Sequence, residues 1–254
     1  MTDSDEVFHC GERIVQDRAG VGARMAVAGR HAIRDFMTEQ HRAFFEQLPF
    51  IVVGSVDAEG QPWASVLAGK AGFAYAAGDR TLTVGALPVT GDPLVLEPGR
   101  KVGLLGIEPH TRRRNRVNGH VIASNARGFS VKVDQSVGNC PQYIQGREFM
   151  WAREAADVDP RATEALNSLD AQAQAFISRS DTLFVATHAP RDPLSSDGSG
   201  RGADVSHRGG RPGFVKLEDD RTFLVPDFTG NFFFMTLGNL QLNPRAGVLF
   251  IDFD

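Results

Sequence analysis

An internal repeat is the feature of this sequence that most restricts its fold, because a duplicated segment implies two copies of one structural unit. The matching stretches, in chain order, are 72–73 with 213–214, 79–81 with 220–222, 90–91 with 229–230, and 102–108 with 246–252. The first two pairs align without a gap, and the third follows a slip of two residues. Since the order is the same throughout, we interpret the chain as a duplicated module of about 100 residues.

Both copies consist of short apolar stretches separated by turn residues. Residues 50–57, FIVVGSVD, are rich in β-branched side chains, and AEGQP follows as a turn. Residues 182–189, TLFVATHA, restart the pattern, whereas the Gly-, Ser- and Asp-rich stretch 190–205 is typical of a loop. Short strands at this density predict a β-sandwich or a β-barrel.

Helical patterns precede each copy. In residues 38–48, Thr38 is suited to be the N-cap, Phe44, Phe45 and Leu48 form one apolar face, and Pro49 ends the helix. Before the second copy, an amphipathic pattern runs from an expected N-cap at Asp159 to residue 180, with a proline at the first helical position. We expect this second helix to pack on a sheet.

We therefore predict a mainly β chain with flanking helices. Residues 1–49 form an N-terminal helical extension, 50–152 a first β-module, 153–181 a linking helix, and 182–254 a second β-module. The second copy stops two residues past its last matching point, so a sheet there would have an open edge. Either the natural chain is longer than this sequence or another element covers that edge.

Composition excludes several functional classes. A net charge of −4 argues against a general nucleic-acid binder, and no apolar run reaches the roughly 18 residues that cross a bilayer. The acidic N-terminus has no signal-peptide pattern, and two distant cysteines form no disulfide framework, so we expect a cytoplasmic protein. The seven histidines lack the spacing of a metal site, and we predict no metal.

The second copy carries an anion-binding pattern that the first lacks. The stretch SHRGGR combines Arg208 and Arg211 with glycines, which let backbone N–H groups approach a phosphate. The alternative is a solvated basic turn between strands. The first copy has Val66 and Leu67 where the second has His207 and Arg208. TGN at 229–231 precedes an expected short helix over 232–244, whose N-terminus would also favour a phosphate.

Two further features leave alternatives open. Cys140 is either a reactive thiolate or a buried inert thiol, and burial is the commoner case. The basic run TRRRNR at 111–116 binds an anion or a partner, or is an exposed, solvated run.

The stretches ADVSHRGGRPGFV, TFLVPDFTGN and TLGNLQLNPRAGVLFID resemble the FMN-binding split barrel of pyridoxamine 5′-phosphate oxidase-like proteins. In the first copy, RVNGHV and VDQSVGNCPQYIQGR are also similar to it. The resemblance covers about residues 42–152 and 164–254. It implies two tandem six-stranded Greek-key barrels, the second incomplete if the chain is truncated, with FMN in the cleft between barrels.

The resemblance also implies a set of cofactor-binding residues. Ser206, Arg208 and the backbone of Gly209 would hold the FMN phosphate, with His207 and Arg211 in the same stretch. Pro226 and Asp227 would lie along the isoalloxazine edge, and Asn231 would meet the phosphate or the ribityl chain. Asn139, Gln142 and Tyr143 would come from the other barrel. The three phenylalanines at 232–234 depart from the family pattern, and they either weaken the phosphate contact or change the pose of the flavin.

Three functional hypotheses follow. The first is a flavoprotein oxidoreductase, related to pyridoxamine phosphate oxidase, that passes electrons or hydride through FMN, with a separate reductase as a possible partner. The second is a module that binds or senses flavin, haem or a deazaflavin without turnover. The third is a structural protein whose basic run 111–116 docks a partner. The expected assembly is a homodimer or an intrachain pseudo-dimer.

Overall fold

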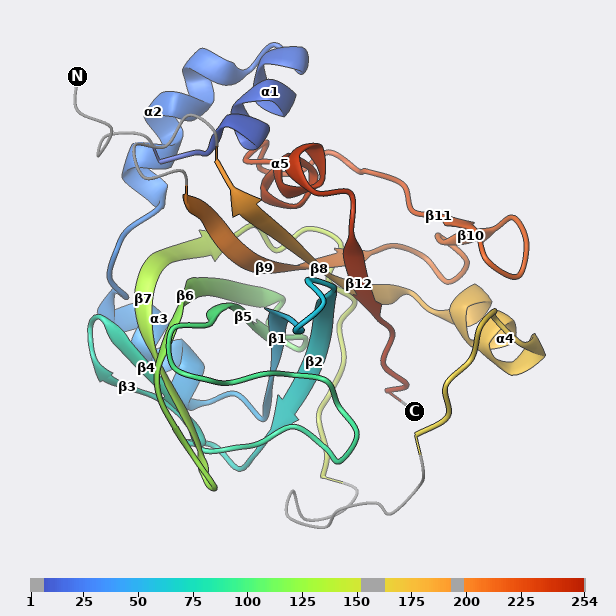
Figure 1. Cartoon of the computed structure of the whole chain (residues 1–254), viewed down its shortest axis with the longest axis horizontal. Helices are drawn as coiled ribbons and strands as arrows, with labels where there is room; N and C mark the ends of the chain where they lie inside the picture. Colours follow the sequence, from blue (N-terminus) through green and yellow to red (C-terminus); the bar gives the residue numbers. More distant parts are fainter. Residues whose placement is uncertain (1–6, 152–162, 193–198, 254) are drawn as a thin grey trace.

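The computed structural model describes residues 7–151, 163–192 and 199–253, which contain five helices and twelve strands (Figure 1). The chain begins with α1 (Cys10–Arg18), α2 (Gly22–Ala32) and α3 (Glu39–Glu46). The prediction of α3 is confirmed, since the Thr38 side chain accepts a hydrogen bond from the His41 N–H as its N-cap. The chain turns into the first strand just after Pro49.

A curved antiparallel sheet forms the first half of the molecule. Its strands are β1 (Phe50–Val56), β2 (Pro62–Ala68), β3 (Ala74–Gly78), β4 (Thr81–Val84), β5 (Lys101–Glu108), β6 (Arg113–Asn125) and β7 (Gly128–Asn139), in the order β2-β1-β5-β6-β7-β4-β3. The main core fills its concave side, where Ile51 and Val53 meet Phe44 and Phe45 of α3. The mainly β split-barrel fold is thereby confirmed, with seven strands in the sheet rather than six.

The second half is smaller. β8 (Thr182–Arg191), β9 (Ser199–Gly209) and β12 (Ala246–Leu249) form a sheet in the order β12-β8-β9, and β10 (Lys216–Leu217) pairs with β11 (Phe223–Leu224). The helices are α4 (Ala171–Arg179) and α5 (Met235–Leu242). Its three-stranded sheet repeats the order β2-β1-β5 of the first half, with Ser206 paired to Val185 as Ser65 is to Val53.

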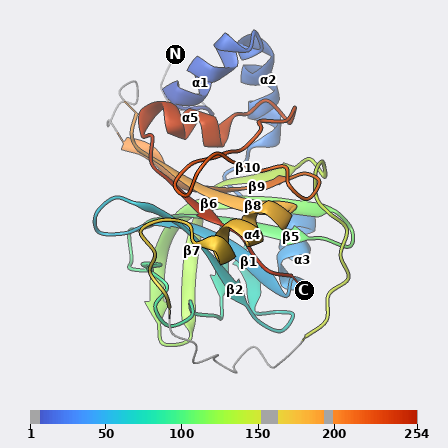
Figure 2. The same ribbon diagram turned by 90° about the vertical axis from the view of Figure 1, so that its right-hand side faces the viewer.

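The two sheets pack through the outer face of β1 and β5. Val52 and Leu105 point away from the barrel core and join Phe184 and Val205 in a second apolar cluster, as expected from the period of two in a strand. Gly103 permits the close approach of the sheets, because a Cβ atom there would lie 2.8 Å from the Asp204 Cα. Figure 2 shows β8 and β9 layered between the barrel and the helices α1, α2 and α5.

Helices α1 and α5 cross in direct contact. A Cβ atom on Gly11 would lie 2.2 Å from the Gly238 carbonyl oxygen, so the backbones touch where neither residue has a side chain. His9 caps α1 and its Nε2 atom lies 2.9 Å from Asn239 Oδ1. The N-terminal extension therefore packs against α5 and stabilises its position.

The expected linking helix is shorter than predicted. Its N-cap is Asp170, which accepts from the Ala173 N–H, and residues 163–170 are irregular. Asp159 and Pro160 lie outside the described residues. The reason is tertiary, since the backbone N–H of Leu169 donates to Asp220 O of the loop between β10 and β11.

The loop prediction for 190–205 is also wrong at residues 190–191, which end β8, and from residue 199 onward, while residues 193–198 lie outside the described residues. Residues 199–205 are the first part of β9, where Asp204 pairs with Thr187 and Gly202 with Ala189. The long partner strand β8 supplies hydrogen bonds that override the weak strand propensity of Gly, Ser and Asp. At the other edge of this sheet, β12 packs against the start of β2, with Gly247 in contact with Pro62. No helix in the described residues is long and apolar enough to cross a membrane.

Candidate functional site

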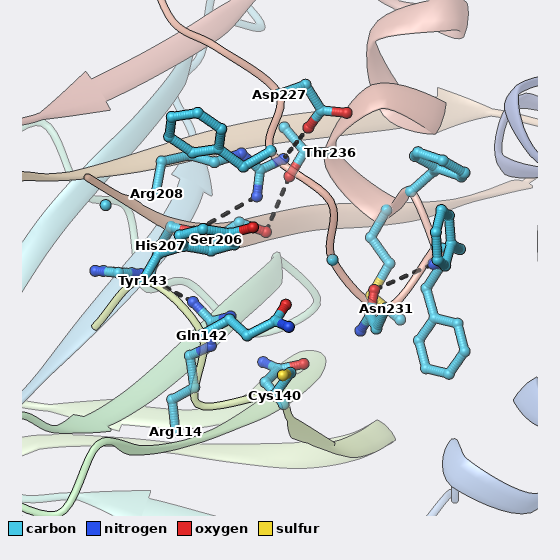
Figure 3. A pocket seen from close by; sticks show the side chains of 18 of the residues that line it. Arg114, Cys140, Gln142, Tyr143, Ser206, His207, Arg208, Asp227, Asn231 and Thr236 are labelled. Atoms are coloured by element: carbon cyan, nitrogen blue, oxygen red, sulfur yellow. Dashed lines mark hydrogen bonds and ion pairs between the residues drawn. The ribbon is translucent and has the colours of Figure 1, made fainter. Parts of the chain in front are cut away.

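A pocket lies between the two halves, at the end of β9 (Figure 3). Strand β6 and the segment after β7 line one side, and β9, the loop after β11 and the start of α5 line the other. Its polar and charged lining consists of Arg114, Arg116, Asn139, Gln142, Ser206, His207, Arg208, Asp227, Asn231 and Thr236. The sequence-predicted residues from both halves thus come together at one cleft.

Arg211 is the exception among the predicted site residues. It is exposed and does not line the pocket. Gly210 leaves the sheet by donating its N–H to Asp181 O, and the chain turns so that Phe214 N–H donates to Arg211 O. This turn directs Arg211 to the surface, outside the pocket that the other predicted residues line. The neighbouring Ser206–Gly209 stretch is strand rather than a solvated turn, and both Ser206 and His207 are 4% exposed.

Ser206 and Arg116 form the floor of the pocket. The Ser206 hydroxyl accepts hydrogen bonds from Arg116 Nη2 at 2.6 Å and from Thr236 Oγ1 at 2.9 Å. Arg116 Nη1 lies 3.0 Å from Asp204 Oδ1, and both side chains are almost completely buried. A buried ion pair with further hydrogen bonds holds Arg116 in one position.

Two more arginines face the same space. Arg208 Nη2 lies 3.8 Å from Asp227 Oδ1, and Arg114 Nη1 lies 2.8 Å from His207 Nδ1. Burial, with the charges of Arg116 and Arg208, lowers the pKa of Arg114 to about 10, which leaves it cationic at neutral pH. Burial is also the main cause that lowers the pKa of Arg208.

The charges and open donors of this cluster suit an anion. Two of the three guanidinium groups pair with carboxylates, Arg116 with Asp204 and Arg208 with Asp227, whereas Arg114 contacts His207. Arg114 Nε and Arg116 Nε are buried without a hydrogen-bond partner among the described residues. Buried N–H groups of charged side chains are costly to leave unpaired, and a phosphate has the acceptor oxygens that such groups lack here.

An aromatic rim closes the mouth of the pocket. Tyr143 stacks on Phe228 with ring centroids 5.2 Å apart, and its hydroxyl donates to Thr229 O at 2.9 Å. Tyr143, Phe232 and Phe234 have φ angles of 65°, 62° and 56°, in the left-handed region that bulky residues avoid. Strain of this kind clusters at ligand sites.

The cavity behind the rim has a volume of about 100 Å³. Pockets for whole organic ligands are typically about 300–1,000 Å³. The cavity as it stands therefore fits a phosphate group and is smaller than a tricyclic ring requires.

Comparison with known proteins identifies the first half. The family profile described as pyridoxamine 5′-phosphate oxidase matches residues 37–153. The first barrel belongs to the pyridoxamine 5′-phosphate oxidase-like family. The match ends within ten residues of the last pocket residue that this half contributes, Tyr143.

Two solved structures are similar to part of the chain. HupZ of group A Streptococcus is 13% identical with a TM-score of 0.33, covering 40% of this chain and 93% of HupZ. A candidate pyridoxamine 5′-phosphate oxidase of Lactobacillus delbrueckii is 15% identical with a TM-score of 0.30, covering 41% of this chain and 94% of that one. A comparison with curated proteins gave no match.

Sequence reasoning missed two arginines contributed by the oxidase-like barrel. Arg114 and Arg116 belong to the basic run 111–116, for which an exposed, solvated run remained an alternative. In β6 the side chains of Arg114 and Arg116 lie on one face of the strand and that of Arg113 on the other. The Arg113 guanidinium lies over the Phe44 ring at 5.0 Å from its centroid. A period of two within the run was the available signal, because residues 114 and 116 of a strand share one face. Thr236 and Cys140 also line the pocket.

Asn231 is in the pocket but not at a helix N-terminus. Helix α5 begins at Met235 and its N-cap is Phe234, so the predicted helix exists but starts later than the 229–231 motif requires. Asn231 Oδ1 accepts from the Phe233 N–H at 3.1 Å and stabilises the turn before the helix. The left-handed conformation of Phe232 and Phe234 prevents an earlier helix start.

The equivalent position in the oxidase-like barrel has the opposite chemistry. Ser65 Oγ donates to Asp92 Oδ1 at 2.7 Å, and Asp92 accepts from Leu94 N–H as Asn231 does from Phe233. Leu67, which matches Arg208, is almost completely buried in the barrel core. This position has an internal carboxylate where the second half presents guanidinium groups.

Proposed function

We propose that this protein is an FMN-binding flavoprotein and an oxidoreductase that passes electrons or hydride through FMN. The observation that supports it is the convergence of Arg114, Arg116 and Arg208 in the cleft between the two halves. Three guanidinium groups, two of which have a buried Nε–H without a partner among the described residues, match a phosphate monoester in charge and in hydrogen-bond geometry. The family of the first barrel supports a flavin ligand.

Each side of the cleft has a separate task in this proposal. Arg114, Arg116 and Arg208 hold the phosphate, with the hydroxyls of Ser206 and Thr236 beside it. Asp204 keeps Arg116 in place without facing the solvent.

The remaining lining residues meet the rest of the cofactor. Pro226 and Asp227 border the ring system, and Asn139 and Gln142 approach it from the oxidase-like barrel. Tyr143 and Phe228 exclude water from the mouth once the ring is seated. Bound FMN supplies the electron or hydride transfer, and the protein supplies position and electrostatics.

The two halves of one chain replace the two barrels of a dimer in this proposal. The shared strand order and the equal pairing of Ser65 and Ser206 support an origin by duplication. The pocket takes residues from both halves, so one chain forms one complete site. A separate reductase is the proposed electron donor, and the free thiols of Cys10 and Cys140 fit the proposed cytoplasmic location.

A binding module without turnover is the second candidate. The small cavity and the stacked Tyr143–Phe228 pair favour it, because a closed rim retains a ligand better than it exchanges a substrate. Such a module would bind FMN tightly and transfer no electrons.

A spectrum followed by a titration tests the proposal. We expect the purified chain to be yellow, or to quench FMN fluorescence on titration, and to bind riboflavin at least tenfold more weakly because riboflavin has no phosphate. Electron transfer from a reduced nicotinamide through the bound flavin to an electron-accepting dye then separates the oxidoreductase from the storage module. A purified chain that is colourless and does not bind added FMN would contradict both candidate functions.

A further inference from the structure

Arg114 and His207 meet across the boundary between the two halves. Arg114 is on β6 and His207 on β9, and Arg114 Nη1 lies 2.8 Å from His207 Nδ1. A guanidinium only donates, so His207 Nδ1 is the acceptor and the imidazole proton is on Nε2. The histidine side chain is therefore neutral and faces a buried cation.

The His207 ring is held rigidly in this position. Its plane meets the Phe184 ring edge-on, with centroids 5.7 Å apart. A Cβ atom on Gly209 would lie 2.9 Å from His207 Cε1, so only glycine fits next to the ring. Burial and the adjacent guanidinium groups lower the pKa of His207 to about 3, so the ring stays an acceptor at neutral pH.

The three pocket arginines have different partners. Arg116 pairs with Asp204 at 3.0 Å and Arg208 with Asp227 at 3.8 Å, so a carboxylate offsets part of each charge. Arg114 has no salt bridge to a carboxylate in the part of the chain that the structure describes. A neutral acceptor orients a guanidinium without cancelling its charge, which remains available to a ligand.

We infer that His207 is a positioning residue that orients Arg114 toward the ligand's anionic group. We also infer that Arg114 is the strongest single hydrogen-bond donor to the anion in the pocket. This inference rests on the proposed function and deepens it. It also changes the role of His207, which orients Arg114 and does not itself contact the anion.

Two amide variants test the inference with little change in polarity. In His207→Asn the side-chain oxygen falls near the place of Nδ1 and can still accept from Arg114. In His207→Gln the amide falls near the place of Nε2, which has no partner among the described residues. We expect His207→Gln to weaken FMN binding about tenfold, the scale of a hydrogen bond to a charged group. His207→Asn should stay within about threefold of the parent.

Riboflavin separates positioning from a general structural role. It shares the ring and the ribityl chain with FMN but has no phosphate, so its affinity should be equal in the parent and both variants. Arg114→Gln should lose more FMN affinity than His207→Gln, because it removes the cation itself, and at least as much as Arg208→Ala. The double variant should lose no more than Arg114→Gln alone, because His207 acts on the ligand only through Arg114. Equal losses for FMN and riboflavin, additive losses, or His207→Asn weaker than His207→Gln would each overturn the inference.

Inorganic phosphate keeps the test independent of the flavin assignment. If the parent binds phosphate but not FMN, the proposed function fails. The phosphate affinities of the parent and the variants are then compared by titration calorimetry, and we expect the same order of affinities. A parent that binds neither FMN nor phosphate overturns both proposals.

Discussion

The hydroxyl of Ser65 donates a 2.7 Å hydrogen bond to the carboxylate of Asp92. The equivalent hydroxyl, that of Ser206, instead accepts from the guanidinium of Arg116 at 2.6 Å. The two serines occupy the same place in sheets of the same order, yet one faces an internal anion and the other an internal cation. We therefore propose that only the second serine lies where an external anion binds, so that the chain has one site.

The Ser65–Asp92 pair predicts a binding stoichiometry. Equilibrium dialysis should give one FMN per chain, and Asp92→Asn should leave this number unchanged, since the asparagine oxygen accepts the same two hydrogen bonds. A second FMN bound by the parent would contradict the single site.

Arg208 and its counterpart Leu67 form a matched pair for mutation. Arg208→Ala should weaken FMN binding by roughly 1.5–3 kcal/mol, the scale of a charge-assisted hydrogen bond. Leu67→Ala should leave FMN affinity nearly unchanged, although it creates a cavity in the barrel core that costs about 2–5 kcal/mol of stability. Fluorescence titrations well below the melting temperatures compare the two variants. A large loss of FMN affinity in Leu67→Ala would mean that the binding site lies in the first half instead.

The aromatic rim should control the speed of binding. Phe228→Ala removes the ring that stacks on Tyr143 and opens the mouth of the pocket. We expect faster association and faster dissociation of FMN in stopped-flow fluorescence, with a smaller change in the equilibrium constant. Tyr143→Phe is the control for the Thr229 hydrogen bond, because it keeps the stacked ring. An unchanged association rate in Phe228→Ala would mean that the rim does not gate the pocket.

His207 should make folding stability depend on pH. Its pKa is about 3 in the folded protein against an ordinary value of 6.5, so the unfolded chain alone binds this proton between those values. Stability is therefore complete above pH 6.5 and falls as the pH decreases, by at most about 1.4 kcal/mol per unit from this group. Urea unfolding from pH 7 to 4.5 should show a shallower decrease in His207→Asn. Parallel curves for parent and variant would exclude this contribution, because His41 and His188 titrate in both.

Gly103 should be essential for packing of the two halves. In Gly103→Ala the new methyl group would meet the backbone of Asp204 at 2.8 Å, so we expect a loss of roughly 1–3 kcal/mol of stability. FMN affinity should fall with it, since Asp204 holds Arg116. Gly78→Ala is the matched control, because a Cβ atom there meets nothing within 4 Å. A neutral Gly103→Ala in thermal unfolding and FMN titration would refute this account of the interface.

Local sequence signals predicted much of the fold. Helix α3 follows from Thr38 and the apolar face of its residues, and the strands follow from β-branched runs between turns. Local signals failed where distant partners decided the structure. The Leu169 backbone bonds to Asp220 instead of continuing a helix, and Asp204 is part of a strand because β8 lies beside it.

The sequence by itself determined the repeated strand pattern and the presence of Ser206 and Arg208 in one copy only, because spacing and residue type are local properties of the chain. Only the tertiary structure brought Arg114 and Arg116 to Ser206 and His207, and it left Arg211 outside. The physical reason is the close packing of two sheets across Gly103, which brings together residues about 90 positions apart and removes their charges from water.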